Sequence, residues 1–195
     1  MGAGHPCKDD IYSAVVNHYF VDIDFVCKQL QAVPTTTDSL MFLVYSVFAL
    51  ACESFGRTPE DTRLVSGIVF RSIISDGKYA RRIFSAYEPV QEKMIRCFEE
   101  AQKRGKIVVP QDNSWMLFWI CHHLALYLGL LLKAESQIID YRQGGRRIHL
   151  EAVRFCLRGI GVKESLLSKI KLESYSAKLE YLMSDLSSGP YRGQP

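Results

Sequence analysis

The chain has 195 residues, of which 48% are hydrophobic and 23% are charged, and its formal net charge is +3. These values are those of an average globular protein with enough residues for one well-packed core. The small charge excludes nucleic-acid binding through a general basic surface. Because residues 1–10 are polar, we expect no secretory signal. Six cysteines stand singly, without a CxxC pair, which favours reduced thiols in a cytoplasmic protein.

The first half of the chain predicts four helices. Apolar residues at steps of three and four predict a helix over residues 8–31, capped by Cys7. Residues 38–55 are apolar on nearly every side, so this helix should be central to the core. The run 58–61 (TPED) is a helix-start signature for a third helix that ends near Gly77. A short basic piece follows over residues 78–84.

The second half continues in the same way. Helices are predicted over residues 88–105, 114–132, 146–158 and 163–186, and residues 187–195 should form a disordered tail. No segment alternates in the manner of a strand. The sequence therefore predicts an all-α protein.

The segment from Ser114 to Leu132 contains no formally charged side chain. Its length and composition would suit a membrane span, and that alternative stays open. His122 and His123, however, lie at its centre, where a bilayer tolerates them poorly. We therefore favour a helix that is buried by its own domain and by a partner subunit, with no membrane involved.

Motifs for catalysis are absent from the sequence. It contains no glycine-rich phosphate loop, no HExxH, no GxSxG and no cysteine–histidine zinc spacing. In the run 121–123 (CHH) adjacent side chains on a helix point about 100° apart, so they cannot converge on one metal ion. Asp22, Asp24 and Glu53 could meet only through the fold. We expect no enzymatic activity, no cofactor and no bound metal.

Aromatic and sulfur-containing side chains are concentrated in the second to sixth predicted helices. Such residues can line an apolar cavity for a small molecule. A filled core explains the same pattern and is favoured by the sequence alone, so both interpretations stay open. The candidate ligand-binding residues are Phe42, Tyr45, Phe48, Cys52, Phe70, Tyr87, Met94, Trp115 and Trp119.

Four short segments, in this order and spacing, resemble the TetR family of transcriptional regulators. Residues 5–12 (HPCKDDIY) are similar to the junction that follows the family's recognition helix. Residues 105–112 (GKIVVPQD) are similar to the connection before its first dimerisation helix, and 128–130 (LGL) to a small-residue point within that helix. Residues 155–161 (FCLRGIG) are similar to the end of its second dimerisation helix.

This resemblance implies a ligand-responsive repressor, represented here by its effector-binding and dimerisation body over residues 8–161. Residues 162–186 would form an additional C-terminal helix. Residues 1–7 would be a remnant of the head-to-body junction or vector sequence. The family's helix-turn-helix head is absent from the chain, removed by cloning or lost in nature, and a natural headless adaptor that titrates intact repressors is a further alternative.

The implied partners are a second copy of the chain and a small apolar or aromatic effector. Operator DNA would be bound only through the absent head. Two helices from each subunit would form a four-helix interface, and its expected residues are Trp119, His122, His123, Leu126, Leu128, Gly129, Ile148, Ala152 and Phe155.

Overall fold

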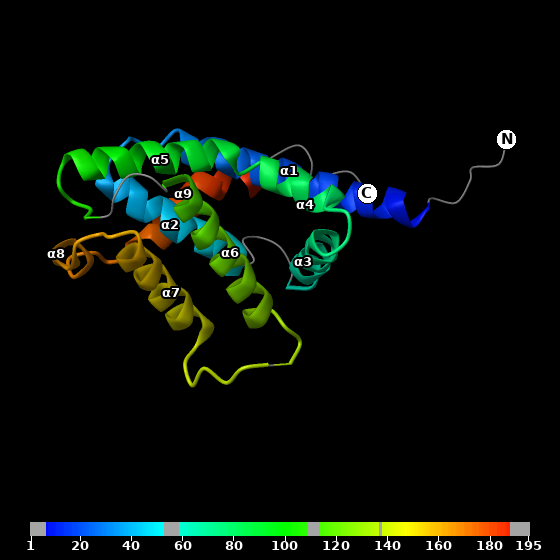
Figure 1. Ribbon diagram of the computed structural model, residues 1–195. Coiled ribbons are helices and arrows are strands. Elements are labelled where there is room, and N and C mark those ends of the chain that lie inside the picture. Colours follow the sequence, from blue (N-terminus) through cyan, green and yellow to red (C-terminus); the bar gives the residue numbers. More distant parts are fainter. Residues whose placement is uncertain (1–6, 53–58, 109–113, 137, 188–195) are drawn as a thin grey trace.

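The computed structural model describes residues 7–52, 59–108, 114–136 and 138–187 (Figure 1). Within these ranges there is no strand, and the one β-type contact is an isolated antiparallel bridge between Ile107 and Val162. The prediction of an all-α fold is confirmed. The helices are α1 (Lys8–Gln31), α2 (Thr37–Cys52), α3 (Pro59–Ile73), α4 (Lys78–Ser85), α5 (Glu88–Lys103), α6 (Ser114–Leu132), α7 (Gly145–Gly159), α8 (Glu164–Leu167) and α9 (Ser174–Ser187).

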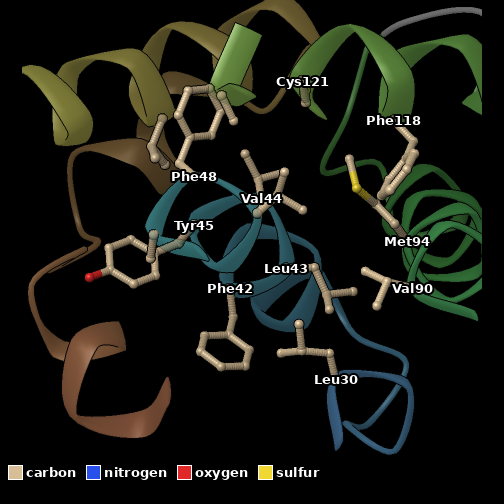
Figure 2. Packing of buried hydrophobic residues seen from close by; sticks show 14 of the residues in the cluster. Leu30, Phe42, Leu43, Val44, Tyr45, Phe48, Val90, Met94, Phe118 and Cys121 are labelled. Atoms are coloured by element: carbon tan, nitrogen blue, oxygen red, sulfur yellow. The ribbon is translucent and has the colours of Figure 1, made fainter. Parts of the chain in front are cut away.

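Helix α2 forms the centre of the core. Every residue from Ser39 to Ala49 is buried, because α2 packs against α5, α6, α7 and α9. Phe42, Val44 and Tyr45 leave the helix in different directions, each toward another part of the surrounding layer (Figure 2). Burial of each large apolar side chain contributes about 1.5–3 kcal/mol, so a helix that is apolar all round is stable only in this enclosed position.

Helices α1 and α5 run side by side along one edge of the molecule (Figure 1). The predicted apolar stripe of α1 faces the core, where Cys27 and Leu30 are fully buried. Cys7 is the N-cap residue of α1, as predicted. On the outer side of α5, Arg104 pairs with Glu100 at 2.5 Å. That pair marks a solvated surface, as the charge spacing indicates.

The segment after α5 is tied to the end of α7. The amide of Val108 donates to the carbonyl of Gly161, and the amide of Lys163 donates to the carbonyl of Lys106, both at 3.2 Å. Gly105 and Gly161 have φ angles of 62° and 83°, a left-handed conformation that favours glycine. Residues 105–112 and 155–161, two of the four segments that carry the family resemblance, are thus in direct contact through Val108 and Gly161.

The prediction of one helix over residues 163–186 is wrong. The chain forms the short α8, then turns, and α9 begins only at Ser174. Leu172, just before α9, is fully buried, and the turn lets α9 pack against α1 and α2. Phe55, residues 1–6 and the tail from residue 188 lie outside the described residues, so the predictions made for them are not addressed.

Candidate functional site

Helix α6 buries only one side of its uncharged surface. The side facing the body carries Phe118, Cys121, His122, Ala125, Leu128 and Gly129. The opposite side exposes Met116, Ile120, His123 and Tyr127, whose spacing of four, three and four residues forms one stripe. Within the described ranges, α6 alone has the length and apolar composition of a membrane span, and 33% of that window is buried.

Helix α7 packs against α6 and extends the exposed apolar surface. Phe155 is 69% exposed, and Ile148 and Ala152 are half-buried on the same stripe of the helix. A charged pair, Glu151 with Arg154 at 2.8 Å, lies beside it. Contiguous exposed apolar residues with a polar border are typical of an interaction surface. We call this surface the α6–α7 face and define it by Met116, Ile120, His123, Tyr127, Ile148, Ala152 and Phe155.

The structure divides the nine expected interface residues into three groups. His123 and Phe155 are exposed, and Trp119, Leu126, Ile148 and Ala152 are half-buried. His122, Leu128 and Gly129 are buried against their own subunit. Sequence reasoning missed Met116, Ile120 and Tyr127, because a helix without charges gives no signal of which side faces out.

Gly129 has a role within the subunit. A Cβ atom added at this position would lie 2.3 Å from the carbonyl oxygen of Ala51. The backbones of α2 and α6 therefore approach closely at a point where only glycine fits. The small residue that the resemblance assigned to a dimer contact instead sets the distance between two core helices.

Aromatic rings surround His122 at the centre of α6. The ring centroids of Tyr87, Phe84 and Trp119 lie 4.7, 5.2 and 5.4 Å from that of His122, each in an edge-to-face arrangement. Phe118 stacks on the same imidazole at 6.1 Å. Such geometries are favourable for aromatic pairs, so the side chain of His122 is held in one position.

Burial keeps His122 uncharged. Desolvation, with a smaller contribution from the charge of His123, lowers the pKa of His122 to about 3. Its Nδ1 atom is buried and has no hydrogen-bond partner among the residues described. A buried ring nitrogen without a partner is unfavourable, so His122 offers a hydrogen-bonding position to a ligand.

The imidazole of His122 lines a small, partly open space, which we call the aromatic cavity. Its walls come from α1, α2, α3, α4 and α6, and its free volume is about 40 Å³. Drug-sized ligands occupy pockets of roughly 300–1,000 Å³. A small molecule could enter only if the helices or side chains around the cavity moved. Its lining residues are Tyr19, Val47, Leu50, Ala51, Val65, Ser66, Val69, Ile83, Phe84, Tyr87, His122, Leu126, Leu130 and Lys133.

The nine candidate ligand-binding residues do not converge on this cavity. Tyr87 lines it, and Trp119 touches the rings of Phe84 and His122 beside it. The rest are distributed between core, surface and another cleft. Phe42, Tyr45, Phe48 and Met94 are buried in the core, Phe70 and Trp115 are exposed, and Cys52 lines a cleft near the start of α7.

One polar residue that the sequence did not indicate fixes the first turns of α6. Gln91 on α5 is 6% exposed. With its amide oriented so that the oxygen faces the two indoles, that oxygen accepts from the indole nitrogens of Trp115 at 2.6 Å and Trp119 at 3.0 Å. The two tryptophans are one turn apart, so a single acceptor serves both. Gln91 therefore holds the wall of the aromatic cavity that Trp119 supports.

Helix α4 connects the aromatic cavity to the start of α1. Ile83 and Phe84, at one end of α4, line the cavity. At the other end, Lys78 pairs with the carboxylate of Asp9 at 2.6 Å, and the hydroxyl of Tyr79 donates to the same carboxylate. These hydrogen bonds, that from Lys78 foremost, lower the pKa of Asp9. A shift of α4 would act directly on the first turn of α1.

Among the described residues, no group of three or more histidine, cysteine, aspartate or glutamate side chains could hold a metal ion. No family model, curated protein or solved structure matches the chain.

Proposed function

We propose that this chain is the effector-binding and dimerisation body of a TetR-type transcriptional repressor. The observation that carries the proposal is the position of α4, which contacts the aromatic cavity through Phe84 and the amino end of α1 through Lys78. In an intact repressor the residues before α1 would lead to the DNA-binding head. The same short helix would therefore link the ligand site to DNA binding.

The proposed effector is a small aromatic molecule with one hydrogen-bond donor. Most residues that line the aromatic cavity are apolar, although Ser66 and Lys133 also line it. We assign neutral His122 the tautomer in which the partnerless Nδ1 atom is a hydrogen-bond acceptor. Because the free volume is about 40 Å³, an effector must displace Phe84 or its neighbours. A ligand that binds one arrangement of helices better shifts the population toward that arrangement.

The proposed dimer forms through the α6–α7 face around a twofold axis. A twofold interface is self-complementary, so each subunit contributes the same surface. Two heads on such a dimer must be separated by about 34–36 Å to fit successive major grooves. Movement of α1 by a few ångströms in each subunit would spoil that fit and release the operator.

The alternative is a membrane-associated protein in which α6 contacts lipid. The exposed apolar stripe of α6 favours it. The charged pair of Glu151 and Arg154 beside the stripe favours a protein partner, because charged side chains are costly in the hydrocarbon region. The mass of the protein in buffer without detergent separates the two candidates.

The ligand proposal can be tested at Cys7, the exposed cysteine at the start of α1. In protein with Cys52→Ser, a spin label on Cys7 reports the distance between the two α1 helices of a dimer. We expect 2-naphthol to raise the melting temperature and to change that distance by several ångströms, whereas naphthalene, which has no donor, should bind more weakly.

Substitution of the imidazole provides the control for this experiment. His122→Phe removes the acceptor and keeps an aromatic ring of similar size, so it should abolish the preference for 2-naphthol over naphthalene. If neither compound, nor indole, alters the melting temperature or the label distance, the effector proposal is refuted.

A further inference from the structure

A second and larger cleft lies at the other end of α6. It has a volume of about 600 Å³ and is lined by the ends of α2 and α6, by residues 134, 139, 141 and 143, by the start of α7 and by part of α9. This volume falls within the range of small-molecule sites. This cleft and the aromatic cavity share no lining residue. Figure 1 shows the long connection between α6 and α7.

The floor of the cleft is apolar and rests on the core. Leu132 and Ile148 contribute half-buried aliphatic side chains from α6 and α7. Beneath them, the ring of His149 is 1% exposed, stacks on Phe48 at 6.3 Å and lies 5.1 Å from the ring of Tyr45. A ligand on this floor would therefore contact a surface already ordered by the core.

The two walls carry opposite charges. Arg146 lines the cleft from α7, and Glu180 lines it from α9. In the described part of the chain no ion pair joins them. The hydroxyl of Ser176 donates to the carboxylate of Glu180 at 2.9 Å, which orients that carboxylate. A guanidinium matches the geometry of a carboxylate ligand, and an oriented carboxylate accepts readily from an ammonium group.

We propose that this cleft binds a small zwitterion with an apolar body, that is, a free amino acid or a dipeptide with apolar side chains. The ligand's carboxylate would pair with Arg146 and its ammonium group with Glu180. Its side chain would lie on Leu132 and Ile148. This site is independent of the proposed effector in the aromatic cavity, and it would couple α7 to α9.

Isothermal titration calorimetry on the full chain tests the proposal with L-phenylalanine and the dipeptide leucyl-phenylalanine as probes. Two truncated analogues separate the charges: 3-phenylpropionate lacks the ammonium group, and 2-phenylethylamine lacks the carboxylate. We expect at least one zwitterion to bind about tenfold or more tightly than either analogue, because each analogue lacks one of the two charged hydrogen bonds.

Variants at exposed positions assign the two contacts. Arg146→Met should weaken the zwitterion and 3-phenylpropionate about tenfold and leave 2-phenylethylamine unchanged. Glu180→Gln should weaken binding of the zwitterion and of 2-phenylethylamine about tenfold and leave binding of 3-phenylpropionate unchanged. Arg147→Met and Glu173→Gln alter exposed charges outside the cleft and should have no effect.

Absence of heat for both zwitterions, or affinities that none of the cleft variants changes, would overturn the proposal. Equal binding of 3-phenylpropionate and the zwitterions would overturn it as well, since the cleft would then recognise a simple acid. Binding of 2-naphthol at His122 is measured with a different probe and a different variant. A negative result for the cleft therefore does not refute the effector proposal, and a negative result for the aromatic cavity does not refute the cleft proposal.

Discussion

His122 should make the stability of the protein sensitive to mild acid. Its pKa is about 3 in the folded chain, against 6.5 in a free side chain. Between these values the unfolded state binds more protons than the folded state, so stability falls as the pH is lowered. From pH 7 to pH 5 this one residue should reduce the free energy of unfolding by about 2 kcal/mol.

Urea denaturation at pH 7, 6 and 5 measures the effect. His122→Phe should lose this part of the pH dependence, whereas His18→Gln, at an exposed position on α1, should retain it. An unchanged pH slope in His122→Phe would show that the imidazole is protonated or solvated in the folded state.

For single residues, the sequence predicted which side chains are buried better than it predicted their hydrogen bonds and protonation. Apolar periodicity located Leu30 and the all-apolar pattern located Phe42 in the core, because burial follows the sequence pattern of each helix. The importance of His122 and Gln91 depends on residues from other helices that surround them. No local pattern carries that information.

The spacing of α2 and α6 gives a prediction at the scale of the element. Gly129→Ala would place a Cβ atom 2.3 Å from a backbone oxygen of α2. Since backbone cannot move aside as a flexible side chain does, the helices must separate, and we expect a loss of about 1–3 kcal/mol in stability.

Gly67→Ala is the matched control. It lies within α3, and nothing is within 4 Å of the added Cβ, so the higher helix propensity of alanine should stabilise the protein by about 0.5–1 kcal/mol. Thermal or urea unfolding of the two variants should thus move in opposite directions. A neutral Gly129→Ala variant would contradict the close approach of the two helices.

Helix ends that carry clear start or stop signals in the sequence were predicted well, and helix ends without such signals were not. Cys7 with its two following acids predicted the start of α1. No glycine or proline marks the turn between α8 and α9, which forms because α9 packs on α1 and α2. Nothing in the sequence indicated the cap on α4 either: the buried hydroxyl of Ser72, near the end of α3, accepts from the amides of Tyr79 and Ala80 in the first turn of α4.

Across the whole molecule, α6 has three environments. One side packs on α2, the residues near His122 line the aromatic cavity, and the stripe with Tyr127 is exposed. Charged side chains are therefore disfavoured on one side by packing in the core and on another by the apolar cavity, whereas the exposed stripe has neither of these causes. This explains why composition predicted that the helix is hidden but could not assign its sides.

Assembly through the α6–α7 face is the prediction for the molecule as a whole. In buffer without detergent, light scattering should give the wild type a mass of twice 22.2 kDa. Tyr127 and Phe155 are 58% and 69% exposed, so replacing both by glutamate should not disturb the core. Because a twofold interface would bring four new charges into contact with an apolar surface, the double variant should be monomeric.

The control for assembly is Tyr181→Glu on α9, which is 78% exposed and outside the α6–α7 face; it should remain dimeric. A wild-type monomer would remove the proposed dimer. Protein that stays in solution only with detergent would instead support α6 as a membrane-contacting helix, since lipid and a second subunit are the two environments that would accept this stripe. A soluble dimer that the double variant dissociates would make the exposed stripe of α6 a subunit interface.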